Sequence, residues 1–353
     1  MRKRSIGGAL ACILLAGTGV AGCSSDSSAS EVRGSLTAIG TPVQQDPIGA
    51  WSSAWTKVHN ATSVNYSPDG SDVGVTALST GQAYFAALDT PLTQAQQDQT
   101  KPACGPAGAF SVPVSITSVG VAFNMPSVQT LKLSPAVLAG IFSGDITRWD
   151  AAEIRELNPG TTLPSSDIVP VTAVQRSAET RAATGYLSRD PEWTAGVTDV
   201  WPKPKNGIEV KKLSDVGAKV DQTAGAIAFM TAGANGGRFD TALLSFGEGF
   251  VRMSKDSSAI AGQEGATRTV PTGVEFTLPE VSAQGYALGV IGYQAFCPTY
   301  KNAPLTTLVK SWGNYVVSSD GQVASTYFAN VVSPSEAALK ASKTLIEAIG
   351  EQA

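Results

Sequence analysis

Three short polar segments carry the side chains best suited to bind a small ligand. They are Gly40-Thr41-Pro42, Asp69-Gly70-Ser71-Asp72 and Leu88-Asp89-Thr90-Pro91. Each follows a strand-like segment and precedes a helix-like one, and a helix N-terminus favours an anion. Backbone N–H groups and hydroxyls there could hold a small polar ligand. Thr, Ser and Asp at such positions are, however, more often simple helix caps.

The segments around these loops alternate between strand and helix patterns. Strands alternating with helices indicate an α/β protein with largely parallel sheets. In such sheets ligands lie beyond the carboxyl ends of the strands, where these loops are expected. We expect helix caps at Ser134, Asp150 and Ser333, the last in a capping box with Pro334 at the first helical position. The expected strands cover 36–40, 63–67, 83–88, 114–124 and 168–174, and the expected helices cover 49–58, 74–80, 135–142, 151–157 and 334–349.

Catalytic and metal chemistry are poorly supported by the residue types present. The only histidine is His59, which we expect at an exposed helix end. One histidine excludes a Ser-His-Asp triad and a histidine-based metal site. A surface hydrolase would need a metal cluster or an activated nucleophile, and neither is evident in the sequence. We therefore expect a protein that is not an enzyme and has no cofactor or bound metal.

Composition is that of a folded protein with an acidic balance. Hydrophobic residues make up 42% and charged residues 15% of the 353 residues, which does not indicate a disordered chain. A chain of this length exceeds what one core usually covers, so two lobes are expected. The formal net charge is −4, and no basic stripe indicates a nucleic-acid partner.

The first 23 residues have the layout of an export signal. Arg2, Lys3 and Arg4 precede an uncharged apolar stretch over 6–22, which is typical of a secretory signal peptide. Its last residues, Val20-Ala21-Gly22-Cys23, resemble the lipobox of bacterial lipoproteins, in which the cysteine receives a lipid. We expect a signal over 1–22 and a lipid-bearing Cys23 that anchors the protein outside the cytoplasm at the cell membrane. The alternative is an ordinary signal peptide with an incidental cysteine.

The residues after Cys23 fit a tether, and the remaining cysteines fit an oxidising compartment. We expect a small, polar, flexible segment over 23–32. Removal of 1–22 takes away three positive charges and no negative ones, which changes the net charge from −4 to −7. Cys12 leaves with the signal, so Cys104 and Cys297 remain, and such a pair usually forms a disulfide in an oxidising space.

The order of segments in the chain resembles the PstS-like phosphate-binding proteins of ABC transporters. The most specific stretch is Gly120–Asn124 followed by Leu133–Asp150, which contains Phe142-Ser-Gly-Asp-Ile-Thr-Arg-Trp-Asp150. Leu157-Asn-Pro-Gly160 and Ala224–Phe229 follow in the family's order. The resemblance implies two α/β lobes, two hinge strands and a ligand cleft between the lobes. It also implies a monomer that delivers phosphate to a membrane permease.

The same resemblance implies lobe boundaries and ligands in the first lobe. The first lobe would comprise 33–118 plus 284–353, and the second would comprise 119–283, so that both remaining cysteines lie in the first lobe. Thr41, Ser71 and Asp89 match the family's phosphate-binding residues, with Asp89 accepting a proton from the oxyanion. Pro42 departs from the pattern because it has no N–H to donate.

The second-lobe half of the site departs further from the family. Ser177 matches the family's serine, but Ala173 occupies the arginine position and Glu179 the threonine position. A phosphate would thereby lose a cation and a hydroxyl and gain a nearby carboxylate. Arg176 or Arg181 could replace the cation, and we expect Arg176, beside Ser177, to do so. The alternative is that Arg176 is an ordinary surface residue.

Two functions are therefore compared. In the first, the chain captures phosphate or a related oxyanion for an ABC importer. In the second, it is a related protein with an altered cleft that acts as a surface sensor or scaffold, or binds a different small molecule. Asp72, Asp89 and Glu179 favour the second, because carboxylates make a cleft less hospitable to an anion.

Overall fold

A computed structural model describes residues 32–247 and 249–352. The expected signal peptide, the expected lipidation at Cys23 and the expected tether up to residue 31 lie outside the described residues. In the part of the chain that the structure describes, no helix is both long enough and apolar enough to cross a membrane.

Most of the strands form one mixed sheet. Its order is β2-β1-β3-β13-β4-β8-β6-β7, and β12 additionally pairs with both β4 and β11. β1 runs parallel to β2 and to β3, so the carboxyl ends of these three strands lie at one edge. The strands of this sheet are β1 (Arg33–Gly40), β2 (Ala61–Ser67), β3 (Phe85–Leu88), β4 (Phe110–Phe123), β6 (Val169–Ala173), β7 (Ile208–Val210), β8 (Ala226–Thr231), β11 (Ala266–Val270), β12 (Gly273–Thr277) and β13 (Gly289–Phe296).

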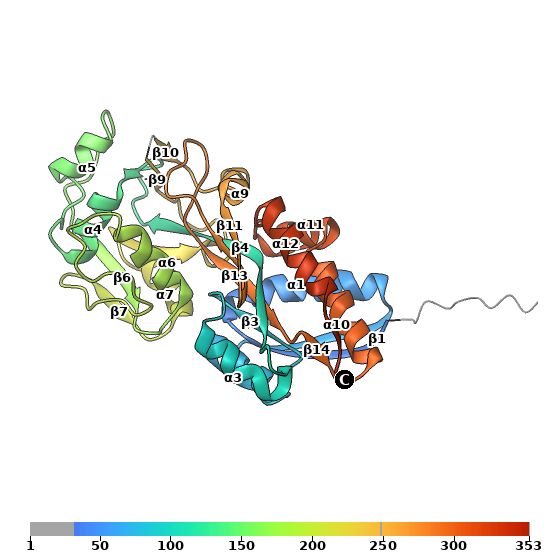
Figure 1. Cartoon of the computed structure of the whole chain (residues 1–353). Helices are drawn as coiled ribbons and strands as arrows, with labels where there is room; N and C mark the ends of the chain where they lie inside the picture. The colour runs from blue at the N-terminus through green and yellow to red at the C-terminus, as the bar shows by residue number, and fades with distance from the viewer. Residues whose placement is uncertain (1–31, 248, 353) are drawn as a thin grey trace, which may run out of the picture. The chain divides into compact units, whose positions relative to one another are not determined.

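The described helices fall into two groups (Figure 1). One group covers the strands at the beginning and end of the chain, and the other covers the middle strands. The first group is α1 (Gln45–Val58), α2 (Ser71–Ser79), α3 (Gln94–Cys104), α10 (Ala303–Val316), α11 (Ser319–Ala329) and α12 (Glu336–Glu347). The middle group is α4 (Pro135–Ser143), α5 (Ala152–Leu157), α6 (Ala178–Leu187), α7 (Val216–Asp221), α8 (Ala232–Asn235) and α9 (Lys255–Glu264).

Short elements complete the connections. Two 3-10 turns, η1 (Pro42–Gln44) and η2 (Leu213–Asp215), lead into helices. Two small sheets have the strand orders β10-β9-β5 and β14-β15. The strands of these small sheets are β5 (Lys132–Leu133), β9 (Leu243–Ser245), β10 (Phe250–Val251), β14 (Thr299–Tyr300) and β15 (Gly350–Glu351).

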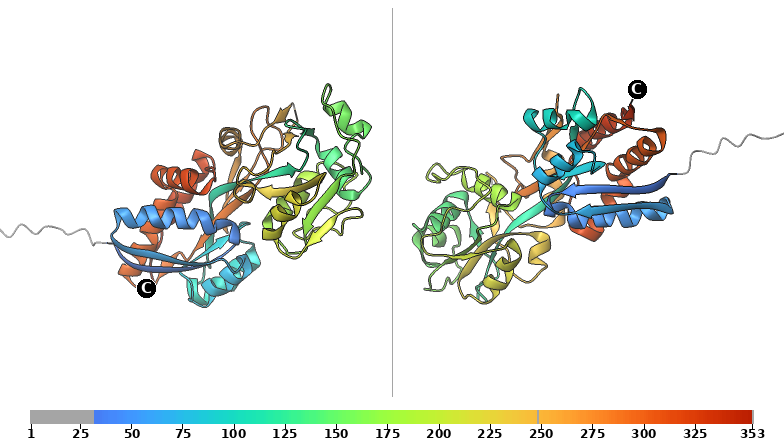
Figure 2. Two further views of the ribbon diagram at one scale, coloured as in Figure 1. Left: turned by 180° about the vertical axis from the view of Figure 1, so that it is seen from behind. Right: turned by 90° about the horizontal axis from the view of Figure 1, so that it is seen from below.

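Two strands pass from one group of elements to the other (Figure 2). β4 pairs with β13 over its first half and with β8 over Val119–Phe123. Its residues Val112 and Val114 are buried in one hydrophobic core, whereas Val121 is buried in another. The chain therefore has two lobes that share β4 and β13, which confirms the expected fold class. Val274 of β12 lies within 119–283, the range expected for the second lobe, but packs in the first core. The exact lobe boundaries at 118/119 and 283/284 stay a prediction.

The strand and helix types expected from the sequence are confirmed, with shifts at their ends. The expected helix over 74–80 begins earlier, at Ser71, because Gly70 with φ 108° turns the chain directly into the helix. The expected strand over 114–124 begins at Phe110, since pairing with β13 extends it. Helix α12 ends at Glu347, two residues before the expected Ile349, and Gly350 begins a short strand instead of closing the helix.

Two expected caps are wrong. Asp150 does not cap α5, because its carboxylate pairs with Arg148 at 3.1 Å and Arg155 at 3.3 Å, and Ala151 takes the cap position. Ser333 does not cap α12. The cap is Ser335, whose hydroxyl accepts a hydrogen bond from the Ala338 N–H at 3.3 Å.

The start of α12 is delayed by pairing with β4. The Val332 N–H donates to the Ile116 carbonyl at 2.9 Å, and the Val332 carbonyl accepts from the Ile116 N–H at 2.8 Å, which keeps the preceding chain extended. The helix consequently begins only at Glu336, two residues after the expected Pro334.

A disulfide links two distant parts of the first core. Cys104, at the end of α3, bonds to Cys297, which directly follows β13. Both side chains are buried, and 193 residues separate the cysteines in the sequence. In the chain-entropy description such a cross-link stabilises by restricting the unfolded chain.

The double substitution Cys104→Ala with Cys297→Ala is expected to lower the free energy of unfolding by about 2–5 kcal/mol. The reason is the long loop that the cross-link closes. Urea unfolding followed by circular dichroism measures the change. A reductant should destabilise the wild type and leave the double variant unaffected. Equal unfolding midpoints for the two proteins would contradict the prediction.

Candidate functional site

The three polar loops expected from the sequence meet at one edge of the sheet. The Thr41 N–H donates to the carbonyl of Ala87 at 2.8 Å, which joins the loop after β1 to the end of β3. The Asp89 N–H donates to the Ser71 hydroxyl at 3.3 Å, which joins the loop after β3 to the start of α2. Thr41, Ser71 and Asp89 are thereby brought together from three separate segments.

Glycine makes this close approach possible. A Cβ at Gly40 would lie 1.9 Å from the carbonyl oxygen of Ala87, and one at Gly74 would lie 2.4 Å from that of Ile39. Since real Cβ atoms do not come so close, only glycine fits at either position. Gly74 lies one turn into α2, and its role was not recognised from the sequence. A glycine inside a short helical pattern, beside an expected ligand loop, was the available signal.

The N-terminus of α2 has no side-chain cap. Gly70 occupies the cap position and supplies no side-chain oxygen to the first N–H groups of the helix. Such N–H groups can bind an anion instead, and the helix dipole adds to the attraction. Ser71, the first residue of α2, adds its hydroxyl at the same point. Asp72 follows it and is exposed, so its carboxylate can remain in water.

Tyr66 supports the first loop, although it was not recognised from the sequence. Its hydroxyl donates to the carbonyl of Thr41 at 2.5 Å. Burial raises the pKa of Tyr66 far above its usual value of 10, and the negative charges of Asp89 and Asp69 raise it further. Tyr66 therefore stays a neutral hydrogen-bond donor at every physiological pH. It holds the Thr41 loop beside the two carboxylates.

The second-lobe side of the site is the first turn of α6. Ser177 is its cap, and the Ser177 hydroxyl accepts from the Thr180 N–H at 3.0 Å. The helix period places Ala178, Arg181 and Ala182 on one face, since they are three and four residues apart. These three residues line one cavity with Asp89.

The two candidate arginines differ in their surroundings. Arg176 pairs with Asp199 at 2.7 Å and its side chain is 75% exposed. Arg181 also reaches Asp199, at 3.6 Å, and is among the cavity-lining residues, whereas Arg176 is not. Asp199, whose own side chain is only 21% exposed, thus holds both guanidinium groups. The structure places Arg181, not the expected Arg176, at the cavity.

Glu179 is turned away from the cavity. It shares a helix face with Ala183 and Tyr186, which lie four and seven residues on and are buried in the second core. Its side chain is 4% exposed and accepts a hydrogen bond from the Thr231 N–H at 3.1 Å. Burial raises the pKa of Glu179 from 4.5 to about 8, and the Thr231 hydrogen bond lowers it only in part. The carboxyl is therefore held protonated below that pH.

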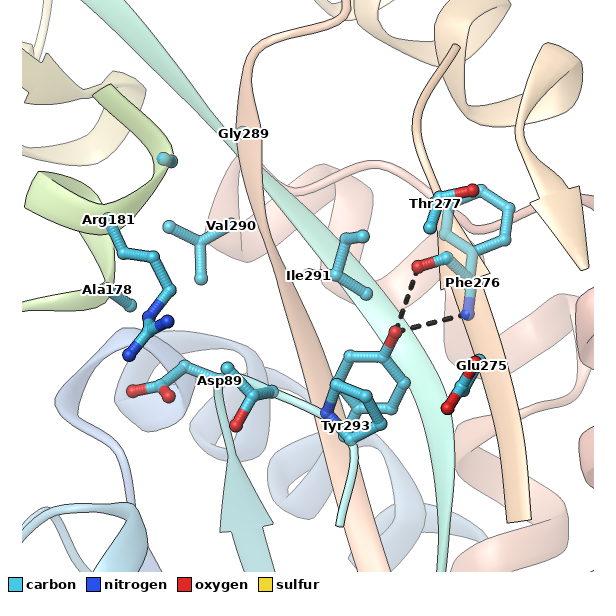
Figure 3. Close-up of a pocket in the computed structure, with 13 residues that line it drawn as sticks. Asp89, Ala178, Arg181, Glu275, Phe276, Thr277, Gly289, Val290, Ile291 and Tyr293 are labelled. Atoms are coloured by element: carbon cyan, nitrogen blue, oxygen red, sulfur yellow. Dashed lines mark hydrogen bonds between the residues drawn. The ribbon is translucent and has the colours of Figure 1, made fainter. Parts of the chain in front are cut away.

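The cavity between these groups has a volume of about 260 Å³. In Figure 3, Arg181 and Asp89 point toward each other at one side of it, with Ala178 and Val290 beside them, and Ile291 and Phe276 lie farther across. The remaining wall comes from β12 and β13. The cavity is thus lined by residues of both lobes and by β13, a strand that the lobes share.

A second cavity, of about 670 Å³, lies elsewhere in the second lobe and includes Arg189, Ser245 and Glu280 in its lining. None of the predicted binding residues lines it, and only Asp89 of that set lines the smaller cavity. In the smaller cavity, by contrast, residues from both lobes converge. No group of three or more His, Cys, Asp or Glu side chains that could hold a metal occurs among residues 32–247 and 249–352.

Comparison with known proteins identifies the family. Residues 25–320 match the family described as PBP superfamily domain. The chain belongs to this superfamily. The phosphate-binding protein PstS 3 of Mycobacterium leprae is 24% identical over 336 residues, which cover 88% of this chain and 90% of that protein. The expected PstS-like relationship is therefore confirmed. The family comprises solute-binding receptors and is not a class of enzymes.

Solved structures show the same fold. A periplasmic phosphate-binding protein, PfluDING, aligns with a TM-score of 0.68 and 18% identity over 90% of this chain and all of that one. An ABC-type phosphate transport receptor from Vibrio cholerae aligns with a TM-score of 0.55 and 15% identity, over 85% of this chain and all of that one. At these identities the likeness concerns the fold alone.

The substitution Glu179→Gln is expected to remove a pH dependence of stability. Because the pKa of Glu179 is raised on folding, the folded chain binds more protons than the unfolded chain between about pH 4.5 and 8. As the pH rises through that range, the unfolding free energy of the wild type should therefore fall by up to about 1.4 kcal/mol per pH unit relative to that of Glu179→Gln. Urea unfolding of both proteins at pH 5, 6, 7 and 8 measures this. A constant difference across that range would show that Glu179 does not titrate as described.

Proposed function

We propose that this chain is the extracytoplasmic binding component of an ABC importer and captures phosphate, or a related oxyanion, between its two lobes. One observation carries the proposal: Asp89 of the first lobe and Arg181 of the second line the same cavity. Thr41 and Ser71 are hydrogen-bonded into the loops beside Asp89. The names of the similar proteins support the same ligand and the same transport role.

The groups around the cavity suit a protonated oxyanion. Ser71, at the uncapped N-terminus of α2, is hydrogen-bonded to Asp89 beside the cavity, and its hydroxyl could donate to the anion once the lobes close. Thr41 does not line the cavity and is 1% exposed, so its proposed contact with the anion needs a change in its loop. Arg181 supplies a positive charge from the opposite side. Asp89 can accept a hydrogen bond only from an oxygen that carries a proton, so it favours phosphate over fully ionised anions of the same shape.

The departures from the family's second-lobe loop are compatible with this role. Arg181 can replace the charge that Ala173, buried in β6, does not provide. Glu179 need not repel the anion, because it is buried against Thr231 and protonated at neutral pH. Ser177 can contribute through its position at the start of α6, as expected from the resemblance.

Capture would follow from movement of the lobes about β4 and β13. These strands belong to both cores, so bending them would bring Arg181 and Asp89 closer together around a ligand. Members of the family are solute-binding receptors. We propose that this chain is a monomer whose closed, ligand-bound form docks on a membrane permease. Residues 33–118 with 284–353 and residues 119–283 are the proposed lobes.

One observation favours the alternative function. The negative charges of Asp69 and Asp89 raise the pKa of Tyr66, whose hydroxyl donates to the carbonyl of Thr41, so two carboxylates lie near the proposed first-lobe binding loop. A surface sensor or scaffold, or a binder of a different small molecule, would tolerate this charge better than a receptor for an anion. Titration with inorganic phosphate separates the two functions.

The substitution Arg181→Ala is expected to raise the Kd for phosphate by roughly 10- to 100-fold, since a hydrogen bond to a charged group contributes about 1.5–3 kcal/mol. Isothermal titration of the purified mature protein with inorganic phosphate measures it. Arg176→Ala is the matched control and should change the Kd by less than about threefold, because that side chain is exposed and held by Asp199. A larger effect of Arg176→Ala would transfer the cationic role to Arg176. Absence of heat from the wild type at millimolar phosphate would overturn phosphate capture.

Lipid anchoring at Cys23 is also proposed, and cell fractionation tests it. Cys23→Ser should remove the lipid and move the protein from the membrane fraction to the soluble fraction, because acyl chains supply the membrane affinity. Cys12→Ser, within the expected signal peptide, is the control and should leave the protein at the membrane. A Cys23→Ser protein that remains bound to membranes would contradict lipidation at this position.

A further inference from the structure

A buried glutamine ties the first-lobe half of the site to a strand that the lobes share. Gln44 ends the turn η1, which follows the Thr41 loop, and its side chain is 0% exposed. The amide nitrogen of Gln44 donates to the carbonyl of Leu88 at 2.8 Å and to that of Tyr293 at 2.7 Å. Leu88 and Tyr293 lie opposite each other in the ladder of β3 with β13. Gln44 therefore joins the first loop to both of these strands.

The contact with Leu88 restricts the direction of Asp89. The Leu88 carbonyl and the Asp89 N–H belong to one planar peptide unit. Gln44 binds the carbonyl of that unit, and the Ser71 hydroxyl accepts a hydrogen bond from its N–H at 3.3 Å. The peptide is thus held on both sides immediately before the carboxylate that lines the cavity. Loss of the Gln44 contact would weaken this hold on Asp89.

This position requires an uncharged side chain that donates two hydrogen bonds. Both partners of Gln44 are carbonyl oxygens, which accept and cannot donate, so the nitrogen of the amide must face them. A lysine or an arginine would place an unpaired charge in the interior. An ionised glutamate would bring a carboxylate against two carbonyl oxygens, whereas a protonated one could still donate one hydrogen bond. The chemistry of the partners therefore selects glutamine.

An irregular place in β13 lies next to Gln44. The register of β13 with β4 shifts between Gly292 and Tyr293. A Cβ at Gly292 would lie 3.2 Å from the Gln44 Cδ and 2.5 Å from the Ser115 Oγ, so both side chains pack on Gly292. Within residues 32–247 and 249–352, the buried Gln44 Oε1 and Ser115 Oγ atoms have no hydrogen-bond partner. A bend of β13 at Gly292 would therefore break no described hydrogen bond of these two atoms.

We propose that Gln44 is a positioning residue of the phosphate site, which keeps the Asp89 loop fixed to Tyr293 while β13 bends at Gly292. The second lobe, with Arg181, would then close on a carboxylate whose direction does not change. This inference rests on the proposed function and adds to it a residue that does not line the cavity. Gln44 acts through the peptide before Asp89 and does not touch the ligand.

The first test is isothermal titration of the purified mature protein with inorganic phosphate. Gln44→Met keeps the length of the side chain and removes both hydrogen bonds. It is expected to raise the Kd by at least about tenfold, which corresponds to the loss of one hydrogen bond to a charged group.

Gln322→Met is the matched control. The amide nitrogen of Gln322 also donates to two carbonyls, those of Val114 at 2.9 Å and Val316 at 2.7 Å, and none of these three residues lines the cavity. In urea unfolding, Gln322→Met should lose about as much stability as Gln44→Met. Its Kd for phosphate should nevertheless change by less than about threefold, because it lies away from the site.

Gln44→Glu supplies a readout that a loss of stability alone would not move. Burial raises the pKa of a carboxyl group, so Glu at this position should be protonated at pH 5.5 and should ionise as the pH rises. The ratio of its Kd to that of the wild type should therefore increase by roughly tenfold between pH 5.5 and 8.5. Taking the ratio at each pH cancels the titration of phosphate itself. The same ratio for Gln322→Glu should stay constant.

The outcomes distinguish this inference from the proposed function. An unchanged Kd in Gln44→Met, with the wild type binding phosphate, would overturn the inference and leave phosphate capture standing. Equal increases of the Kd in Gln44→Met and Gln322→Met would do the same, because they would reflect lost stability alone. If Gln44→Met does not fold, a pH-independent ratio for Gln44→Glu overturns the inference. No binding of phosphate by the wild type would overturn both.

Discussion

The antiparallel pairing of β4 with β13 is the constraint on which the rest of the structure depends. The pairing runs from Phe110 with Phe296 to Ser118 with Gly289, and β4 then continues into the second lobe beside β8. Both cores are therefore built on the same strand. The cavity is lined by Gly289, Val290 and Ile291 of β13, so its wall is also part of the connection between the lobes.

An irregularity in this pairing lies beside the cavity. The register shifts between Gly292 and Tyr293, opposite Pro113, which cannot donate to the ladder. A Cβ at Gly292 would lie 2.5 Å from the Ser115 hydroxyl, so a larger side chain there would crowd Ser115. Beyond the shift, Tyr293 reaches across to Phe276 and joins β12 to the same wall. The register shift thus lies next to the residue that links β13 to β12 at the cavity wall.

Electrostatics in the second lobe depend on which residues are buried. Asp199 holds Arg176 and Arg181 together, so two positive charges are partly offset by one carboxylate at the start of α6. Glu179, although it neighbours Ala178 in the sequence, is directed into the core and carries its proton. A loop that reads in sequence as hostile to an anion therefore presents a positively charged residue to the cavity.

The sequence by itself determined the fold class, the family and the three first-lobe loops. Alternating strand and helix patterns, and motifs such as that of Leu133–Asp150, depend on near neighbours in the chain, and such local signals can be read directly. The spacing of Ala178, Arg181 and Ala182 on one helix face was equally local, and it was available from the sequence as a sign that Arg181 was the better candidate.

Only the tertiary structure decided how the second half of the site is composed. The pairing of Arg176 with Asp199, the burial of Glu179 against Thr231 and the contact of Tyr66 with Thr41 join residues 23 to 52 positions apart. Whether a charged side chain faces a cavity or a core depends on neighbours that the chain brings together only on folding. Helical spacing groups Arg181 with Ala178 and Ala182 on one face, but only this packing decides that the face turns toward the cavity.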